Sequence, residues 1–240
     1  MTYESIFGIP VAAGEREEMI ALSREMIENG GKISTVNPEI LNLARSRRDL
    51  YFALRESVNI PDGIGVCHAL HRRGIKAERL PGVELGELLL EGGVRFAIIG
   101  GRAGVAAEAA ERLAGKHRGA VPVLSECGYA IRERDYIDRI KAARPSVVFV
   151  CLGSPRQELF IRRAYAEYPA ALYVALGGSA DVYSGRVARA PLVFQRAGLE
   201  WLWRTAREPK RVGRVISAAP FFYFAAKERF LLKSHQNHAK

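Results

Sequence analysis

The sequence predicts an α/β fold: a Rossmann-like, mostly parallel sheet with helices on both faces, followed by a basic helical C-terminal appendage. Two observations predict the sheet. From residue 94 onward, short apolar runs alternate with helical patterns of ten to fifteen residues, as in βαβ units. Several of these runs also end in glycine and small polar residues. A third observation, the crowding of Lys and Arg after residue 203, predicts the appendage. We therefore expect an α/β domain over residues 1–195 and the appendage over residues 196–240.

In the second half of the domain, strand and helix patterns follow one another closely. The run 146–152 is continuously apolar, which is typical of a strand buried on both faces of a sheet. The stretch 103–116 is rich in Ala and Glu and has helical periodicity. We predict strands at residues 94–99, 120–124, 146–152 and 171–176, and helices at residues 103–116, 134–143 and 156–168.

The first 93 residues fit the same class less cleanly. An amphipathic helical pattern stops at Gly30 and Gly31, and a second helix has Pro38 near its first turn, where proline is favoured. A short apolar strand then runs into a Pro-Asp-Gly turn at Asp62. We predict helices at residues 15–29 and 38–45 and strands at residues 32–36 and 57–60.

Composition narrows the class of protein. Of the 240 residues, 48% are hydrophobic and 26% charged, which is ordinary for a globular chain that needs no disulfide or metal to hold its core. The three cysteines are scattered, and the first residues lack the pattern of a secretory signal. No apolar stretch reaches the roughly 18 residues of a spanning helix. We expect a cytoplasmic protein that does not cross a membrane.

The positive charge is concentrated near the C-terminus. Residues 204–240 hold nine Lys or Arg and two Glu, and so carry most of the net charge of +10. Aromatic residues, among them Trp201, Trp203 and the run 221–224, are interleaved with these bases. This combination favours an anionic partner, which is nucleic acid, a phosphorylated substrate or an anionic membrane surface. In the alternative, these aromatics pack on the domain or form an oligomer interface.

Candidate ligand-binding residues follow the predicted strands, because ligands of open parallel sheets bind beyond the carboxyl ends of the strands. Glycine there permits close approach of a ligand to the backbone, and a following helix offers free N–H groups to phosphate. The residues at these ends are Thr35 and Asn37, then Asp62, then Gly100 and Gly101, then Gly153 to Glu158, and finally Gly177 to Asp181.

Several common site motifs are missing from the sequence. There is no P-loop and no D-x-D, and the glycines after residue 99 do not have the G-x-G-x-x-G spacing of dinucleotide sites. His68 and His71 lie three residues apart on an expected helix, without the further ligands of a metal site. We therefore predict no metal. A nicotinamide-dependent oxidoreductase and a basic nucleic-acid-binding module are the alternative functions that the sheet and the basic tail leave open.

Five short sequence motifs, which follow one another along the chain, indicate the function more specifically than the composition does. They are Thr35-x-Asn37-Pro38, Asp62-Gly63-x-Gly65, VCLGSPRQE at residues 150–158, GGSADVYSGRVARAP at residues 177–191 and GLEWLWR at residues 198–204. Together they resemble the WecG/TagA/CpsF family of glycosyltransferases, over about residues 4 to 215.

The resemblance implies a metal-independent, inverting transferase without a cofactor. Such enzymes take N-acetylmannosamine, its uronic acid or glucose from a UDP-sugar. They add it to a polyprenyl-diphosphate-linked saccharide for cell-surface polysaccharides, including exopolysaccharide, at the inner face of the cytoplasmic membrane. The implied partners are therefore the UDP-sugar donor, the lipid-linked acceptor and an anionic membrane surface, with no nucleic acid.

Inverting transfer needs a group that takes the proton of the acceptor hydroxyl, and Asp62 is our candidate for this base. Its Pro-Asp-Gly turn can project a carboxylate into a cleft, although a turn-forming role alone is the alternative. Thr35 and Asn37 are expected to contact the sugar or the acceptor. The alternative for them is a cap on the helix that begins at Pro38.

The remaining candidates bind substrate. Gln157 is expected to hydrogen-bond the sugar or a phosphate, with Arg156 and Glu158 at the rim of the site. Arg79 is assigned to the acceptor or the diphosphate, with a surface ion pair as the alternative. Asp181 is expected to accept from the uracil or the ribose. The resemblance also places three C-terminal arginines where they complete the site: Arg204, Arg211 and Arg214.

Overall fold

A computed structural model describes residues 1–129, 132–208 and 212–238, without the side chains of Arg214, Arg229 and residues 231–238. Its centre is a six-stranded sheet of order β4-β3-β8-β7-β5-β6 in which every neighbouring pair is parallel. This confirms the predicted fold class, and each strand lies within two residues of its predicted bounds. The strands are β3 (Gly31–Val36), β4 (Val58–Pro61), β5 (Arg95–Gly100), β6 (Val121–Glu126), β7 (Val147–Cys151) and β8 (Leu172–Ala175).

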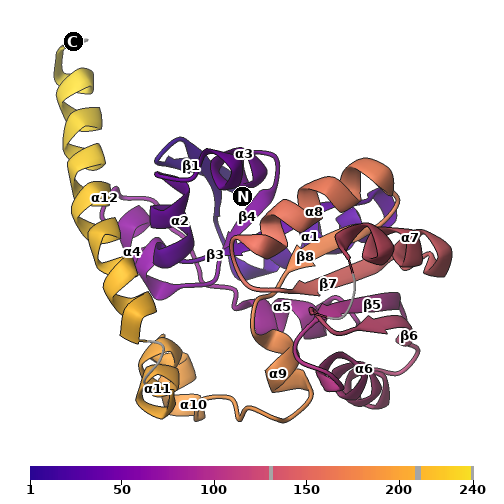
Figure 1. The fold of residues 1–240 in the computed structure, drawn as a ribbon. Coiled ribbons are helices and arrows are strands. Elements are labelled where there is room, and N and C mark those ends of the chain that lie inside the picture. Colours follow the sequence, from indigo (N-terminus) through magenta and orange to yellow (C-terminus); the bar gives the residue numbers. More distant parts are fainter. Residues whose placement is uncertain (130–131, 209–211, 239–240) are drawn as a thin grey trace.

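Helices cover both faces of the sheet (Figure 1) because its central strands are apolar on both sides. On β5, Phe96 and Ile98 point into one core, whereas Ala97 and Ile99 point into the other. The first core is closed by α1 (Arg16–Asn29), α5 (Gly82–Leu88), α6 (Val105–Lys116) and α9 (Ser179–Tyr183). The second core is closed by α7 (Glu133–Ala143) and α8 (Arg156–Glu167).

A two-stranded antiparallel hairpin, β1 (Thr2–Ile6) and β2 (Ile9–Ala13), precedes the sheet and was not predicted. Its turn is Phe7-Gly8, where both residues have positive φ, 55° and 76°, as two-residue hairpin turns require. Buried Asn59 on β4 donates to the Pro10 carbonyl at 2.7 Å and so joins the hairpin to the sheet edge. Three helices complete this region: α2 (Pro38–Ala44), α3 (Arg48–Arg55), also not predicted, and α4 (Ile64–His71).

The C-terminal segment forms α10 (Leu192–Arg196), α11 (Glu200–Arg207) and the long α12 (Val212–His238). α12 lies against α2 and α4, and its far end extends beyond the rest of the chain (Figure 1). Phe221 and Ala225 are buried in the core that α2, α4 and the hairpin share. Glu228 accepts from the Phe7 N–H at 2.9 Å and pairs with Arg73 at 2.6 Å, which ties α12 to the hairpin turn.

The aromatic residues of this segment divide between two environments. Phe221 is buried, as the packing alternative requires, but Tyr223 and Phe230 are mostly exposed. Among the described helices, none, α12 included, combines the length and the apolar character needed to cross a membrane.

Candidate functional site

The predicted site residues gather along the carboxyl edge of the sheet. Because β4, β3, β8, β7 and β5 are parallel neighbours, the residues that follow them lie in a row. In this order, Asp62 follows β4, Asn37 follows β3, Gly177 follows β8, Gly153 follows β7, and Gly100 is the last residue of β5. The fold therefore brings five separate sequence blocks to one edge.

Asp62 is held in place by two backbone contacts. Its own N–H donates to the Val36 carbonyl at the end of β3, at 2.9 Å. Its Oδ1 accepts from the N–H of Gly82, the first residue of α5, at 3.0 Å. The side chain thus bonds to a residue twenty positions on rather than to its own turn. A turn-forming role does not account for this arrangement.

The surroundings of Asp62 make its carboxylate more basic. Burial raises the pKa of the carboxyl group above its ordinary value. The Glu200 carboxylate adds to this increase in pKa. The Gly82 hydrogen bond and the guanidinium groups of Arg79 and Arg204 act in the opposite direction, but burial is the larger effect. A half-buried carboxylate with a raised pKa, flanked by guanidinium groups, is suited to accept a proton next to a developing anion.

Thr35 and Asn37 stabilise the edge itself. The buried Thr35 hydroxyl donates to the Ala175 carbonyl at the end of β8, at 2.7 Å. Asn37 Oδ1 accepts from the Ile40 N–H at 3.0 Å, so Asn37 caps α2 as the alternative interpretation held. Contact of either residue with a substrate stays a prediction.

Gln157 links two loops of the edge. Its Oε1 accepts from the Gly177 N–H at 3.0 Å, and its Nε2 donates to Glu158 at 2.9 Å. Arg156 is exposed as expected, but the expectation that Glu158 lies at the rim is wrong. Glu158 lies in the first turn of α8 with its side chain turned inward, where burial raises its pKa. Gln157 therefore holds the loop after β8 against the loop after β7, and its contact with a ligand stays a prediction.

The four glycines proposed to bind substrate differ in what surrounds them. A Cβ on Gly153 or Gly177 would meet no atom within 4 Å, and both have positive φ, 75° and 54°. In contrast, a Cβ on Gly100 would lie 2.2 Å from the Cys151 carbonyl oxygen. A Cβ on Gly101 would lie 2.6 Å from a Val105 methyl group. Gly100 and Gly101 are thus needed for packing, whereas Gly153 and Gly177 present open backbone.

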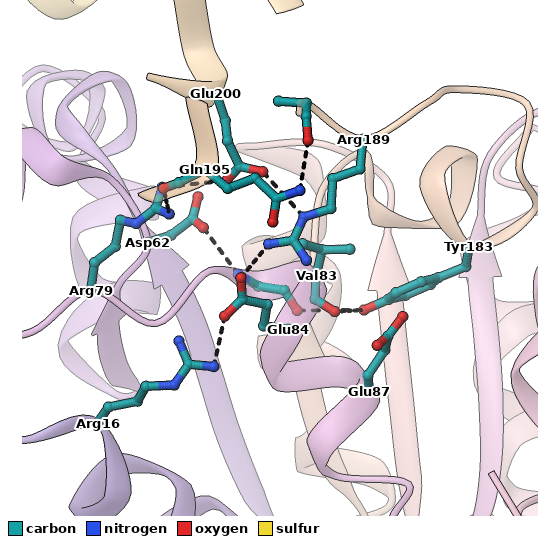
Figure 2. Close-up of polar contacts among 12 residues, drawn as sticks. Arg16, Asp62, Arg79, Val83, Glu84, Glu87, Tyr183, Arg189, Gln195 and Glu200 are labelled. Atoms are coloured by element: carbon teal, nitrogen blue, oxygen red, sulfur yellow. Dashed lines mark hydrogen bonds and ion pairs between the residues drawn. The ribbon is translucent and has the colours of Figure 1, made fainter. Parts of the chain in front are cut away.

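Arg79 belongs to a chain of ion pairs that the sequence did not indicate (Figure 2). Its guanidinium donates to the Gln195 carbonyl at 2.8 Å and to Glu200 on α11 at 3.3 Å. Glu200 also pairs with Arg189 at 3.2 Å. Arg189 in turn pairs with Glu84 on α5. The ion pair expected as the alternative for Arg79 is therefore present, but it is largely buried: the Arg79 and Glu200 side chains are 16% and 13% exposed.

The other predicted residues are placed less completely. Arg204 is half-buried on α11, and it lies close enough to Asp62 for its charge to lower the pKa of that carboxyl group. Asp181 lies on α9 with its backbone carbonyl accepting from the Val187 N–H at 2.9 Å, and its ligand role stays a prediction. Arg211 and the side chain of Arg214 lie outside the described residues.

No cluster of three or more His, Cys, Asp or Glu side chains suited to a metal ion occurs in the part of the chain that the structure describes. The independence of the reaction from metal is still a prediction, which requires a direct assay.

Comparison with known proteins identifies the family. The chain matches the Glycosyl transferase WecG/TagA/CpsF family over residues 4–235. This chain belongs to that family. It is also 36% identical over 214 residues to the N-acetylglucosaminyldiphosphoundecaprenol N-acetyl-beta-D-mannosaminyltransferase of Bacillus spizizenii (strain ATCC 23059 / NRRL B-14472 / W23). That match spans 86% of this chain and 83% of the relative.

Family membership makes this chain a glycosyltransferase and confirms the resemblance. It decides against the nicotinamide-dependent oxidoreductase that the sheet alone left open. The edge formed by Asp62, Gly153 and Gly177 is accordingly the candidate active site of the transferase.

Proposed function

We propose that this transferase moves N-acetylmannosamine from its UDP derivative to N-acetylglucosamine carried on a polyprenyl diphosphate. The relative is named for N-acetyl-β-D-mannosaminyl transfer to N-acetylglucosaminyldiphosphoundecaprenol. The match to it over most of both chains is the observation that carries this choice over glucose or the uronic acid. The transfer is proposed to serve the synthesis of a cell-surface polysaccharide.

The proposed reaction is a single displacement with Asp62 as the general base. An acceptor hydroxyl of the N-acetylglucosamine attacks the anomeric carbon of the donor and gives its proton to the Asp62 carboxylate. The bond between that carbon and the UDP oxygen breaks, and UDP leaves with the bonding electrons. Arg79 and Arg204 flank Asp62 and supply positive charge for the leaving diphosphate. Displacement from the opposite side inverts the anomeric configuration.

The open backbone at Gly153 and Gly177 is the proposed location of the UDP-sugar. Both glycines lie in short loops that lead from a strand into a helix, Gly153 before α8 and Gly177 before α9. Gln157 fixes the separation of the two loops through the Gly177 N–H. The nucleotide and the general base Asp62 therefore occupy different parts of the edge, because two strands, β3 and β8, lie between β4, which precedes Asp62, and β7, which precedes Gly153.

We also propose that α12 rests on the anionic inner face of the cytoplasmic membrane, where a lipid-linked acceptor is accessible. On α12, Val212, Ile216, Tyr223 and Phe230 are exposed and recur at spacings of four and seven, so they share one side of the helix. The surrounding segment is strongly basic. Exposed apolar residues beside basic ones suit a helix that lies in the interface of an anionic bilayer.

Vesicle sedimentation tests the membrane proposal. The full chain should pellet with vesicles that contain phosphatidylglycerol, bind less at high salt, and stay in solution with phosphatidylcholine alone. Replacing both Tyr223 and Phe230 by Ser should weaken binding. Replacing Tyr3 and Tyr129, which are exposed elsewhere, should leave it unchanged. Equal recovery of the two double variants with anionic vesicles would contradict the proposal.

Acceptor-dependent release of UDP tests the function. The full chain is incubated with UDP-N-acetylmannosamine, UDP-glucose or UDP-N-acetylglucosamine, with and without a short-chain polyprenyl diphosphate that carries N-acetylglucosamine. We expect release of UDP only from the first donor and only with the acceptor. Release without the acceptor, or no release from any donor, would refute the assignment.

A further inference from the structure

The α10–α11 segment, residues 192–207, is attached to the domain in an unusual way. Neither of its helices contains a buried residue. Leu192, Val193, Trp201 and Leu202 are instead exposed, with Val193 at 76%. Burial of apolar side chains is the usual force that docks a helix. This segment must therefore be held largely by other contacts.

Those contacts converge on Glu200. Its carboxylate lies between two guanidinium groups, with Oε2 3.3 Å from Arg79 and Oε1 3.2 Å from Arg189. Figure 2 shows the side chains of Arg79 and Arg189 converging on Glu200. Arg79 also donates to the Gln195 carbonyl at the end of α10, at 2.8 Å. Glu200 stays 13% exposed although its neighbour Trp201 is at the surface.

The two arginines are themselves anchored in the domain. Arg189 bonds to Glu84 on α5, and Glu84 pairs with Arg16 on α1 at 2.6 Å. Charges of opposite sign thus alternate along one chain of ion pairs. The chain runs from Arg16 on α1 through Glu84 and Arg189 to Glu200 on α11, and it ends at Arg79. Neutralising Glu200 would remove the carboxylate that pairs with Arg79 and one of the two carboxylates that pair with Arg189, the other being Glu84. Partly buried charges tolerate such a loss poorly.

We propose that Glu200 is a positioning residue which, by pairing with Arg79 and Arg189, docks the α10–α11 segment over Asp62. The inference rests on the proposed function, in which Asp62 is the base. Glu200 and Arg204 are four residues apart on α11 and so share one face of the helix. Docking of Glu200 therefore also directs Arg204 toward Asp62, where its charge acts on that carboxylate. Glu200 touches no substrate in this scheme.

Electrostatics give the proposal a second consequence. The described groups that act on the Asp62 carboxyl are Arg79 from the α4–α5 connection, Gly82 on α5, and Arg204 and Glu200 on α11. Cys67 on α4 also faces it, but burial raises the pKa of this thiol to about 11, so it is neutral near pH 7. Glu200 is thus the nearby negative charge that raises the pKa of Asp62. Its removal lowers that pKa. Undocking also withdraws Arg204, which acts in the opposite direction, but the accompanying loss of burial, the largest effect on this carboxyl group, lowers the pKa further.

Hydrogen exchange of the full chain tests the docking without any substrate. Glu200→Gln keeps the shape of the side chain and removes its charge. Amides of α11 should exchange about tenfold faster in this variant, the factor that corresponds to ~1.4 kcal/mol, while the sheet is unchanged. Both tryptophans of the chain, Trp201 and Trp203, lie on α11, so their emission should shift to longer wavelength.

The matched control is Glu56→Gln. Glu56 also bridges two bases, Lys32 at 3.2 Å and Arg162 at 2.9 Å, but Lys32 is near the amino end of β3, away from the site. This variant should leave α11 exchange and tryptophan emission unchanged. Arg189→Gln provides a second disruption and should speed α11 exchange less than Glu200→Gln, because Arg79 still binds Glu200. Unchanged α11 exchange in both site variants would overturn the inference.

The pH profile separates positioning from general support of the fold. In kcat against pH, the acidic limb of Glu200→Gln should lie at lower pH than that of the unmodified enzyme. Glu56→Gln should not move it. An unmoved limb in Glu200→Gln, in an enzyme that transfers sugar, would overturn the inference and leave the proposed function standing. If the unmodified enzyme transfers no sugar, the proposed function fails, and the exchange experiment still decides whether Glu200 docks the segment.

Discussion

Replacing Asp62 by Asn removes the proposed base with little disturbance of the fold. The amide oxygen of Asn can still accept from the Gly82 N–H, which Asp62 binds at 3.0 Å. The volume of the side chain is nearly unchanged. The variant loses the attraction of the carboxylate to Arg79 and Arg204, but it also escapes the cost of burying a charge. We therefore expect the melting temperature to change by less than about 4 °C, the shift for 1 kcal/mol in a domain of this size.

The effect on catalysis should be far larger. Removal of a general base typically costs 100-fold to 10,000-fold in rate, so turnover should fall by at least about 100-fold, or roughly 2.7 kcal/mol of transition-state stabilisation. Affinity for UDP should stay the same, because the open backbone proposed to bind it, at Gly153 and Gly177, follows β7 and β8, whereas Asp62 follows β4.

The assay is initial rate of UDP release at saturating donor and acceptor, measured for the unmodified enzyme, Asp62→Asn and the control Asp138→Asn. Asp138 is an exposed carboxylate on α7 and should be silent. In the unmodified enzyme, activity should fall as the pH drops through the pKa of Asp62. Because burial raises that pKa, the fall should begin above the pH at which an ordinary aspartate, with a pKa of about 3.9, titrates. Near-normal turnover of Asp62→Asn would show that Asp62 is not the general base.

Three further predictions follow from the glycines, the long helix and the absent metal motifs. Gly153→Ala and Gly177→Ala should each cost about 1–2 kcal/mol for positive φ and also abolish UDP binding in calorimetry. The control is Gly92→Ala, because Gly92 is equally open and has a φ of 95° but lies far from the carboxyl edge; this variant should lose stability and still bind UDP. Equal UDP binding by all three variants would contradict the proposed UDP site. Phe221→Ala should lower the free energy of unfolding by about 3–5 kcal/mol because Phe221 is buried, whereas the exposed Tyr223→Ala should lower it by less than about 0.5 kcal/mol. Similar denaturation midpoints for the two variants would contradict the packing of α12 on the domain. Activity should survive excess EDTA; loss that Mg²⁺ or Mn²⁺ restores would show a metal requirement.

Much of the fold could be predicted because its strands are distinctive. Strands such as β5 and β7 are apolar on both faces, and the helices between them are long enough to show periodicity. The β1–β2 hairpin was not predicted because Phe7 occupies a turn position with positive φ, where glycine or asparagine is usual. The eight-residue α3 is too short for periodicity to define.

The site could be predicted only in part. Its blocks follow strands, so their gathering at one edge follows from the parallel topology, as Asp62 and Gly177 show. Side-chain direction does not follow from strand position. Glu158 was expected at the rim, yet α8 begins so that Gln157 and Glu158 face inward while Arg156 is exposed. The Arg79–Glu200 ion pair joins residues 121 positions apart, and the Arg189–Glu84 pair joins residues 105 apart. Single charged residues carry no signal of such distant partners.

Mass spectrometry of the reaction product shows at once whether the enzyme extends the lipid-linked acceptor and whether Asp62 is needed for that step. The unmodified enzyme and Asp62→Asn are incubated in parallel with UDP-N-acetylmannosamine and short-chain polyprenyl-diphosphate N-acetylglucosamine. We expect a lipid-linked product heavier by one N-acetylhexosamine residue from the unmodified enzyme, and at most about one hundredth as much from the variant. An unextended acceptor after complete incubation with the unmodified enzyme, or equal product from both proteins, would contradict this expectation.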